Sequence, residues 1–201
     1  YVPHTFVSFS PERCVKIEEG KISCNPIKGT IDTLTPHAEE IIQTDKKEIA
    51  EHKATVELII DELQRVASRV AIERFRYIDR VELRGKSLLQ VSSEIGGELP
   101  HNYLSRMGDI LFSLLPAGSI TGSPKAAARK YIVDAEKIAR GYYCGVAGYF
   151  DGAKLDSTVL IRFIEIENDK LFFRSGGGIT SESDWEKEYE EVLNKIYLPI
   201  V

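Results

Sequence analysis

The stretch Pro26-Ile27-Lys28-Gly29-Thr30 places a lysine beside a glycine where a predicted strand runs into a turn. Residues 5–9 and 14–16 predict two short strands upstream of it, because apolar and β-branched residues are concentrated there. The turn Glu18-Glu19-Gly20-Lys21 then leads into a third strand over residues 22–27. The lysine therefore follows an antiparallel meander, which sets the class of fold.

Helical and strand patterns follow in groups downstream. Four helices are predicted, from the start signals Thr35-Pro36 (through residue 66), Asn102 (to about 116), Ser123-Pro124 (to about 139) and the capping box Ser183 to Glu186 (to about 197). Strands are predicted over residues 77–83, 88–95, 146–150, 158–166 and 171–173. We expect an α+β fold of layered antiparallel sheets, with helices packed between and outside them, in one domain over residues 1–201.

Composition excludes several classes of protein. The chain has 201 residues, 43% of them hydrophobic, which is enough for one globular domain with a sizeable core. Its net charge of -5 argues against a nucleic-acid partner, which needs a basic surface. Three cysteines far apart in sequence indicate neither a zinc site nor a disulfide framework, so a cytoplasmic location is expected. No apolar stretch approaches the roughly 20 residues that span a bilayer, so no membrane association is expected.

Two pairs of glutamates have the spacing E-x-x-E, Glu48 with Glu51 and Glu188 with Glu191. A separation of three residues places both carboxylates of a pair on one helix face. With about 5 Å between carboxylates and an effective dielectric of about 20, each pair repels by roughly 3 kcal/mol. If the two helices face each other, the cluster attracts a cation, and oxygen ligands suit Mg²⁺. For either pair alone, ordinary solvent-facing charge is the simpler interpretation.

Several other residues have both a structural and a functional interpretation. Lys28 is a surface charge or a nucleophile, and Glu12 is a turn carboxylate paired with Arg13 or a general acid. Ser119 and Thr121 precede a predicted helix N-terminus, where free N–H groups favour anions, although a capping role explains this segment equally well.

Three motifs together resemble the chorismate-utilising enzymes: Ser10-Pro11-Glu12-Arg13, Pro26-Ile27-Lys28-Gly29-Thr30 and Gly118-Ser119-Ile120-Thr121-Gly122-Ser123-Pro124-Lys125. The resemblance covers the whole chain but only the C-terminal half of that family's catalytic domain. Lys28 makes it similar to component I of aminodeoxychorismate synthase, which serves p-aminobenzoate and folate formation. Anthranilate, isochorismate and salicylate synthases usually carry alanine in the P-I-x-G-T slot.

The resemblance implies a mechanism for these residues. Lys28 would add to C2 of chorismate as the C4 hydroxyl departs, Glu12 would protonate that hydroxyl, and ammonia would then attack C4 and expel the lysine. Mg²⁺ would be held by Glu51 and Glu191, with Glu48 and Glu188 in support. The implied substrate-binding residues are Gly29, Thr30, Ser119, Thr121, Tyr143, Arg162, Gly176, Gly177, Gly178 and Lys195.

The resemblance also implies a partner, and it leaves alternatives open. Ammonia would come from a glutamine amidotransferase on a separate chain. One alternative is anthranilate synthase component I, with the same ligands but an aromatised product. Another is a truncated homologue that binds a ligand or partner without turnover, since the family's domain has a comparable stretch before residue 1. The chain departs from the family pattern at Gln90, where a histidine is common.

Overall fold

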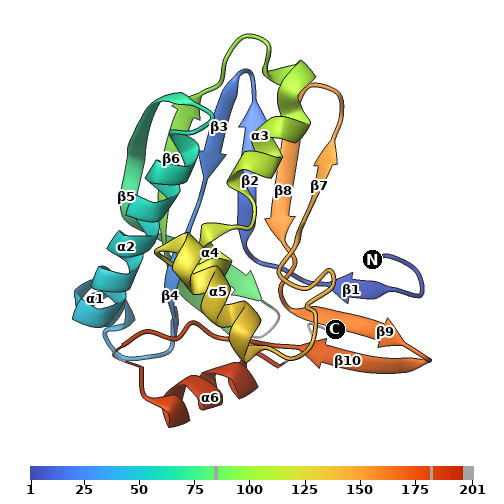
Figure 1. The fold of residues 1–201 in the computed structure, drawn as a ribbon. Helices are drawn as coiled ribbons and strands as arrows, with labels where there is room; N and C mark the ends of the chain where they lie inside the picture. Colours follow the sequence, from blue (N-terminus) through green and yellow to red (C-terminus); the bar gives the residue numbers. More distant parts are fainter. Residues whose placement is uncertain (84–85, 182, 197–201) are drawn as a thin grey trace.

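A seven-stranded antiparallel sheet forms the centre of the computed structural model, which describes residues 1–83, 86–181 and 183–196 (Figure 1). The strand order is β4-β6-β3-β2-β8-β7, and β5 also pairs with β6. Its strands are β2 (Arg13–Glu18), β3 (Lys21–Cys24), β4 (Ile27–Asp32), β5 (Ser68–Leu83), β6 (Lys86–Glu98), β7 (Val146–Phe150) and β8 (Leu155–Val159).

A second, three-stranded sheet projects to one side of the first (Figure 1). It has the antiparallel order β1 (Phe6–Ser8), β9 (Phe163–Glu167) and β10 (Lys170–Arg174). The aromatic rings of Phe6 and Phe163 stack here with their centroids 4.8 Å apart. This contact and the buried Leu160 give the small sheet its own apolar cluster.

The helices are α1 (Ala38–Thr44), α2 (Lys46–Leu63), the 3-10 turn η1 (Tyr103–Arg106), α3 (Met107–Leu114), α4 (Gly118–Thr121), α5 (Lys125–Ala135) and α6 (Trp185–Asn194). Helices α2 and α3 cover one face of the large sheet (Figure 1). Val56, Ile59 and Leu63 of α2 pack there against Ile17 and Ile95 of the sheet. Antiparallel sheets with helices packed on them confirm the predicted α+β fold. No helix among the described residues has both the length and the apolar character needed to cross a bilayer.

The prediction of one helix over residues 35–66 is wrong. Two helices, α1 and α2, meet at Asp45, whose backbone is extended with φ −62° and ψ 111°. The Asp45 carboxylate accepts a hydrogen bond of 3.0 Å from the backbone N–H of Glu48, so it caps α2 and ends α1. The N-cap of α1 is His37, so Thr35 does not occupy the predicted position.

The single strand predicted over residues 158–166 is also wrong, because β8 and β9 belong to different sheets. The extended conformation is interrupted between them at Arg162, which has a φ of 48°. Helix α5 ends at Ala135, earlier than predicted, and Pro124 takes its N-cap position in place of Ser123.

Two further helix predictions need correction. Asn102 precedes the 3-10 turn η1, and its side chain makes no capping hydrogen bond. Asp184, not Ser183, caps α6, since its side chain accepts from the N–H groups of Glu186 and Lys187. The predicted end of this last helix near residue 197 lies outside the described residues.

Candidate active site

Lys28 and Gly29 lie on β4 at an irregularity in its pairing with β6. The register shifts between Ile27 and Thr30, and such bulges redirect side chains next to binding sites. Gly29 has a φ of 85°, and a Cβ atom there would lie 3.3 Å from Ile42 Cγ1 and 3.6 Å from Glu48 Oε2. Both the backbone angle and the proximity of α1 and α2 therefore favour glycine.

Thr30 pairs with Gln90, the residue that departs from the family pattern. The two residues are opposite each other in the β4–β6 register, and Gln90 Nε2 donates to Thr30 Oγ1 at 3.4 Å. Gln90 therefore lies on the neighbouring strand, opposite the residue two positions after Lys28.

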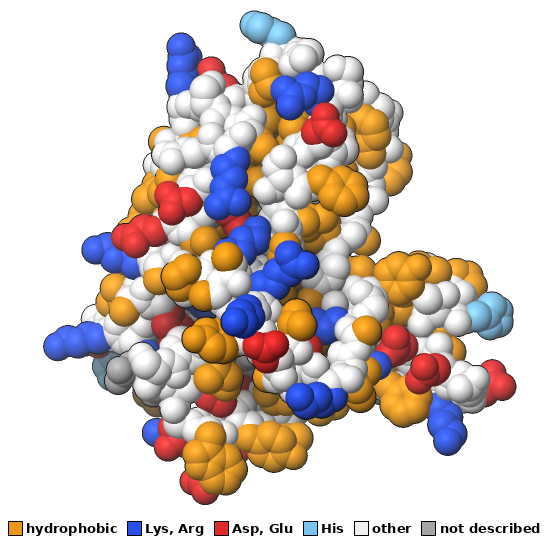
Figure 2. All heavy atoms as spheres, viewed as in Figure 1, with side chains coloured by type: hydrophobic (Ala, Val, Ile, Leu, Met, Phe, Trp, Pro, Cys, Tyr) orange, Lys and Arg blue, Asp and Glu red, His pale blue; other side chains and the backbone are white. Residues whose placement is uncertain are grey.

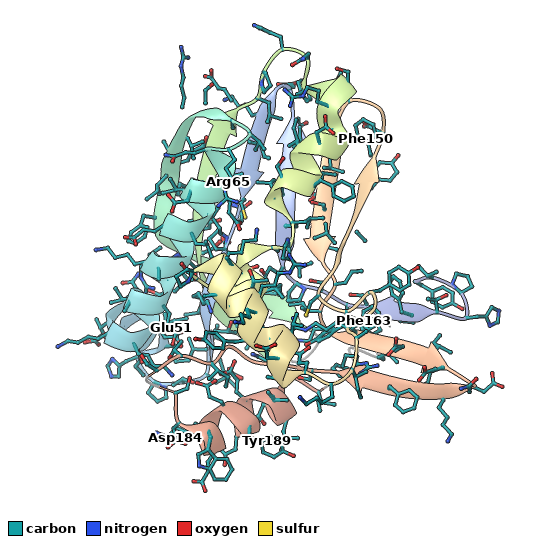
Figure 3. All side chains as sticks on the ribbon, viewed as in Figure 1. Glu51, Arg65, Phe150, Phe163, Asp184 and Tyr189 are labelled. Atoms are coloured by element: carbon teal, nitrogen blue, oxygen red, sulfur yellow. The ribbon has the colours of Figure 1, made fainter. Side chains whose placement is uncertain are left out.

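The acidic faces of α2 and α6 meet through lysine side chains. Lys28 Nζ lies 4.0 Å from Glu51 Oε2, and both side chains are about one-third exposed, at 38% and 32%. Lys47 Nζ lies 3.8 Å from Glu51 Oε1 and 4.0 Å from Glu188 Oε1. Figure 3 shows Glu51 on α2 and, below it, the start of α6 at Asp184. Lys47 therefore links Glu51 to Glu188, but in the described part of the chain the four glutamates do not converge into one cluster.

Glu48 adds a partly buried carboxylate to this group. Burial raises its pKa, and the negative charges of Glu51 and Asp45 raise it further, against the opposing effect of Lys28 and Lys47. Glu48 and Glu51 therefore interact across one turn of α2, as their spacing predicts.

The glycine-rich segment Gly176 to Gly178 lies close to both Tyr143 and α6. A Cβ atom on Gly176 would lie 3.0 Å from Tyr143 Oη, and one on Gly177 would lie 3.9 Å from Glu188 Oε2. Lys195 Nζ donates to the Gly176 carbonyl at 3.4 Å and pairs with Glu191 at 2.5 Å. A Cβ atom on Gly178 would have no contact within 4 Å. The segment thus brings Tyr143 and the α6 acids into one region.

Arg162 and Tyr143 extend this region toward the small sheet. Burial raises the pKa of Tyr143 to about 12, while the nearby guanidinium groups of Arg140 and Arg162 act in the opposite direction. The Arg162 carbonyl accepts a hydrogen bond from the Phe9 N–H at 3.1 Å, which fixes the backbone just before β9 begins. Cationic side chains and a phenol therefore lie near each other in this region.

Glu12 and Ser119 line a common pocket that Pro26 also borders. The Glu12 carbonyl accepts from Thr158 Oγ1 at 2.7 Å and from the Val159 N–H at 3.1 Å, so β8 holds its backbone. Arg13 pairs with Asp156 at 2.9 Å, and the alternative ion pair with Glu12 does not form. Thr121 Oγ1 donates to the Ala117 carbonyl of its own turn at 3.2 Å, which supports a structural role.

In the described part of the chain, the four glutamates do not form a metal-binding group. Among residues 1–83, 86–181 and 183–196, no group of three or more acidic, histidine or cysteine side chains lies close enough to hold a metal ion. Instead, the ammonium group of Lys47 lies 3.8 Å from Glu51 Oε1 and 4.0 Å from Glu188 Oε1. Their oxygen-only chemistry suits Mg²⁺, which binds one or two carboxylates and keeps several waters.

Two residues of the site were missed by the sequence analysis. Lys47 is four residues before Glu51, a spacing that predicts an ion pair on a helix. His52 is fully buried, and its Nε2 lies 2.6 Å from Ser93 Oγ. Burial lowers the His52 pKa to about 4, with Arg76 and Lys28 contributing to the shift. No spacing signal distinguishes this histidine from an ordinary core residue.

Comparison with known proteins identifies the class. The model of the chorismate binding enzyme family matches residues 2–200, and the chain therefore belongs to this family. A Haemophilus influenzae protein named "Uncharacterized PabA-like protein" is 49% identical over 97% of the chain. Anthranilate synthase component 1 of Aquifex aeolicus is 35% identical over 94% of the chain. The crystal structure of anthranilate synthase component I from Streptococcus pneumoniae superposes with a TM-score of 0.80 at 28% identity.

The chain corresponds to only part of each of these proteins. It spans 60% of the Haemophilus protein and 39% of the Aquifex enzyme. In the structural comparison it covers 94% of its own length and 42% of the Streptococcus chain.

Proposed function

We propose that the chain is the C-terminal part of an aminodeoxychorismate synthase component I, which converts chorismate and ammonia to 4-amino-4-deoxychorismate. One observation carries the proposal: Lys28 Nζ lies 4.0 Å from Glu51, at the junction of the acidic faces of α2 and α6. A primary amine in the P-I-x-G-T segment is thereby placed beside the candidate metal ligands. The name of the PabA-like relative supports a link to p-aminobenzoate formation.

The proposed reaction uses Lys28 as nucleophile and Glu12 as acid. The neutral amine forms a bond to C2 of chorismate, both ring double bonds shift by one position, and the C4–oxygen bond breaks. Glu12 gives its proton to the departing hydroxyl, which leaves as water. Ammonia then bonds to C4 and gives one proton back to Glu12, both double bonds shift back, and the C2–nitrogen bond breaks to release the Lys28 amine. The net change replaces the C4 hydroxyl with an amino group.

The remaining residues bind and orient the substrate in this proposal. Arg162 and Tyr143 provide a cation and a hydrogen-bond donor for the enolpyruvyl carboxylate, and the Gly176 to Gly178 backbone offers N–H groups to the same anion. Mg²⁺ would be held by Glu51 and Glu191, with Glu48 and Glu188 in support, and would bind the ring carboxylate when present.

Product analysis tests the proposal directly. The chain is incubated with chorismate, Mg²⁺ and ammonium, and the products are separated by chromatography. We expect aminodeoxychorismate from the native chain and none from Lys28→Ala or Glu12→Gln, while Mg²⁺ binding is retained. Lys21→Ala, at the exposed start of β3, is the matched control and should keep full activity. Anthranilate as the product would reject the proposal, and full activity in Lys28→Ala would reject the nucleophile.

Anthranilate synthase component I is the second candidate, because the Aquifex enzyme of that name is 35% identical to the chain. The same product assay separates the two reactions. A homologue that binds without turnover would instead show Mg²⁺-dependent chorismate binding by calorimetry and form no product.

A glutamine amidotransferase is the proposed source of ammonia. With this partner present, glutamine should replace ammonium in the assay. Glutamine without the partner should give no product. Turnover of glutamine by the chain alone would contradict the proposal that a separate amidotransferase supplies the ammonia.

A further inference from the structure

The pocket beside Glu12 is a small apolar cavity with a carboxylate in its wall. Its volume is about 30 Å³, which is enough for a molecule of the size of water. Most of the wall is apolar and comes from the large sheet and from α2 and α3: Val15, Ile59, Leu63, Leu114 and Val159. Arg13 and Ser119 also line the cavity and are exposed, so solvent reaches it from their side.

The other charged side chains of the wall are already paired. Arg13 contacts Asp156 at 2.9 Å, and Glu62 contacts Lys125 at 2.7 Å. Glu12 differs from them, because only its backbone is hydrogen-bonded, and its carboxylate has no ion pair or hydrogen bond with any residue that the structure describes. The Glu12 carboxylate is therefore the charged group of this cavity that is available to a ligand.

The effect of Glu12 on two neighbouring thiols places its carboxylate beside the cavity. Burial raises the pKa of the Cys14 thiol to about 11 and also raises that of Cys24. The negative charge of Glu12 contributes to both shifts in the same direction. Both thiols line the cavity, and Cys24 is itself buried. The carboxylate therefore lies close to the inner wall.

The size and polarity of the cavity restrict its ligand to a very small hydrogen-bond donor. Drug-sized ligands need at least roughly 300 Å³, so an organic molecule such as chorismate does not fit inside. Apolar walls disfavour an ion that is not paired, whereas a neutral donor needs only one acceptor. Ammonia has the size of water and donates through its N–H groups. In the proposed reaction it must also reach C4 where Glu12 acts, because Glu12 protonates the departing hydroxyl and takes a proton back from the incoming nitrogen.

We propose that this cavity binds the ammonia substrate, which donates a hydrogen bond to Glu12 until the C4–oxygen bond of chorismate breaks. The inference rests on the proposed function, since it assigns a site to the second substrate of that reaction. Ammonium beside the Glu12 carboxylate and ammonia beside the protonated acid differ only in the position of one proton, so the cavity accepts either form. Attack by the bound ammonia then forms the C4–nitrogen bond, and the additional proton returns to Glu12.

Kinetics with a filled cavity test the site. Ala117 is buried and lines the cavity, so the two additional methyl groups of Ala117→Val take up its space. The KM for ammonium should rise about tenfold, while the KM for chorismate and the rate at saturating ammonium stay within about twofold. Ala153→Val, which adds the same groups at an exposed residue before β8, is the control and should change none of these values. An unchanged ammonium KM in Ala117→Val would overturn the inference, and continued formation of aminodeoxychorismate would leave the proposed function intact.

A second measurement needs no turnover. Thermal unfolding of the native chain is compared in ammonium chloride and in sodium chloride at the same concentration, so that ionic strength is matched. At about 0.2 M, ammonium should raise the midpoint by about 2 °C or more relative to sodium, and this difference should disappear in Ala117→Val and in Glu12→Gln. Equal midpoints in the two salts would overturn the inference. Equal stabilisation by potassium, which has no N–H groups, would also overturn it. Ammonium-specific stabilisation of a chain that forms no aminodeoxychorismate would support the site and reject the proposed reaction.

Discussion

Replacing Lys125 with methionine should destabilise the chain strongly. Lys125 ends the motif Gly118 to Lys125, and its Nζ lies 2.7 Å from Glu62 Oε1 and donates to the Leu114 carbonyl at 3.0 Å. The two side chains are only 16% and 8% exposed. This ion pair fastens the start of α5 to the C-terminal end of α2.

The size of the effect follows from burial. Lys125→Met leaves the Glu62 carboxylate buried without its cation, and breaking such a pair costs about 3–5 kcal/mol. That is a large part of the roughly 5–15 kcal/mol that stabilises a typical domain. Removing both charges, with Lys125→Met and Glu62→Leu together, should recover most of the loss, because no uncompensated charge remains.

Urea unfolding at pH 7, followed by circular dichroism, measures the effect. The single variant should unfold at a much lower urea concentration than the native chain. The double variant should unfold at a urea concentration close to that of the native chain. A loss under about 1 kcal/mol in Lys125→Met, or a double variant less stable than the single one, would refute the reasoning.

Two further predictions concern packing and pH. Gly118→Ala should cost about 1–3 kcal/mol in urea unfolding, because the new Cβ would lie 2.7 Å from Leu58 Cδ2 and 2.8 Å from Glu62 Oε1. Gly108→Ala, with no atom within 4 Å of its Cβ, is the control, and equal effects would contradict the packing argument. The folded state lowers the pKa of His52 from 6.5 to about 4. Neutral His52 therefore contributes fully to folding stability above pH 6.5, and this contribution is lost as the pH falls from 6.5 toward 4. The native chain should lose about 2 kcal/mol more than His52→Gln between pH 7 and pH 5, and parallel curves would show that this histidine is not responsible.

Much of the fold could be predicted because alternation and turn residues are local signals. The β2–β3 hairpin and the strand over residues 146–150 follow from such patterns and are present. The predicted three-stranded meander is wrong, because β1 pairs with β9 in the small sheet and the third strand ends at Cys24, before β4. The break at Asp45 was missed because apolar periodicity continues across it, while a capping carboxylate stops the helix. The break at Arg162 was missed because its φ of 48° is imposed by the passage between two sheets.

The sequence indicated which residues belong to the candidate site but not which of them contact each other. Motif spacing indicated Lys28 and the four glutamates, and the structure brings Lys28, Glu51 and Glu188 together. Local spacing does not say which helix faces which, so the bridging lysine at position 47 could not be recognised. Lys125 shows the converse, since its motif suggested anion binding while its ammonium is paired with Glu62.

The most direct test of the central claim is intact-protein mass spectrometry on acid-quenched reactions of the chain with chorismate and Mg²⁺ in the absence of ammonia. The account predicts an adduct with the mass of chorismate less one water, located on Lys28 by peptide mapping and abolished by Lys28→Ala. Product formation with no adduct, or an adduct that persists in Lys28→Ala, would contradict it.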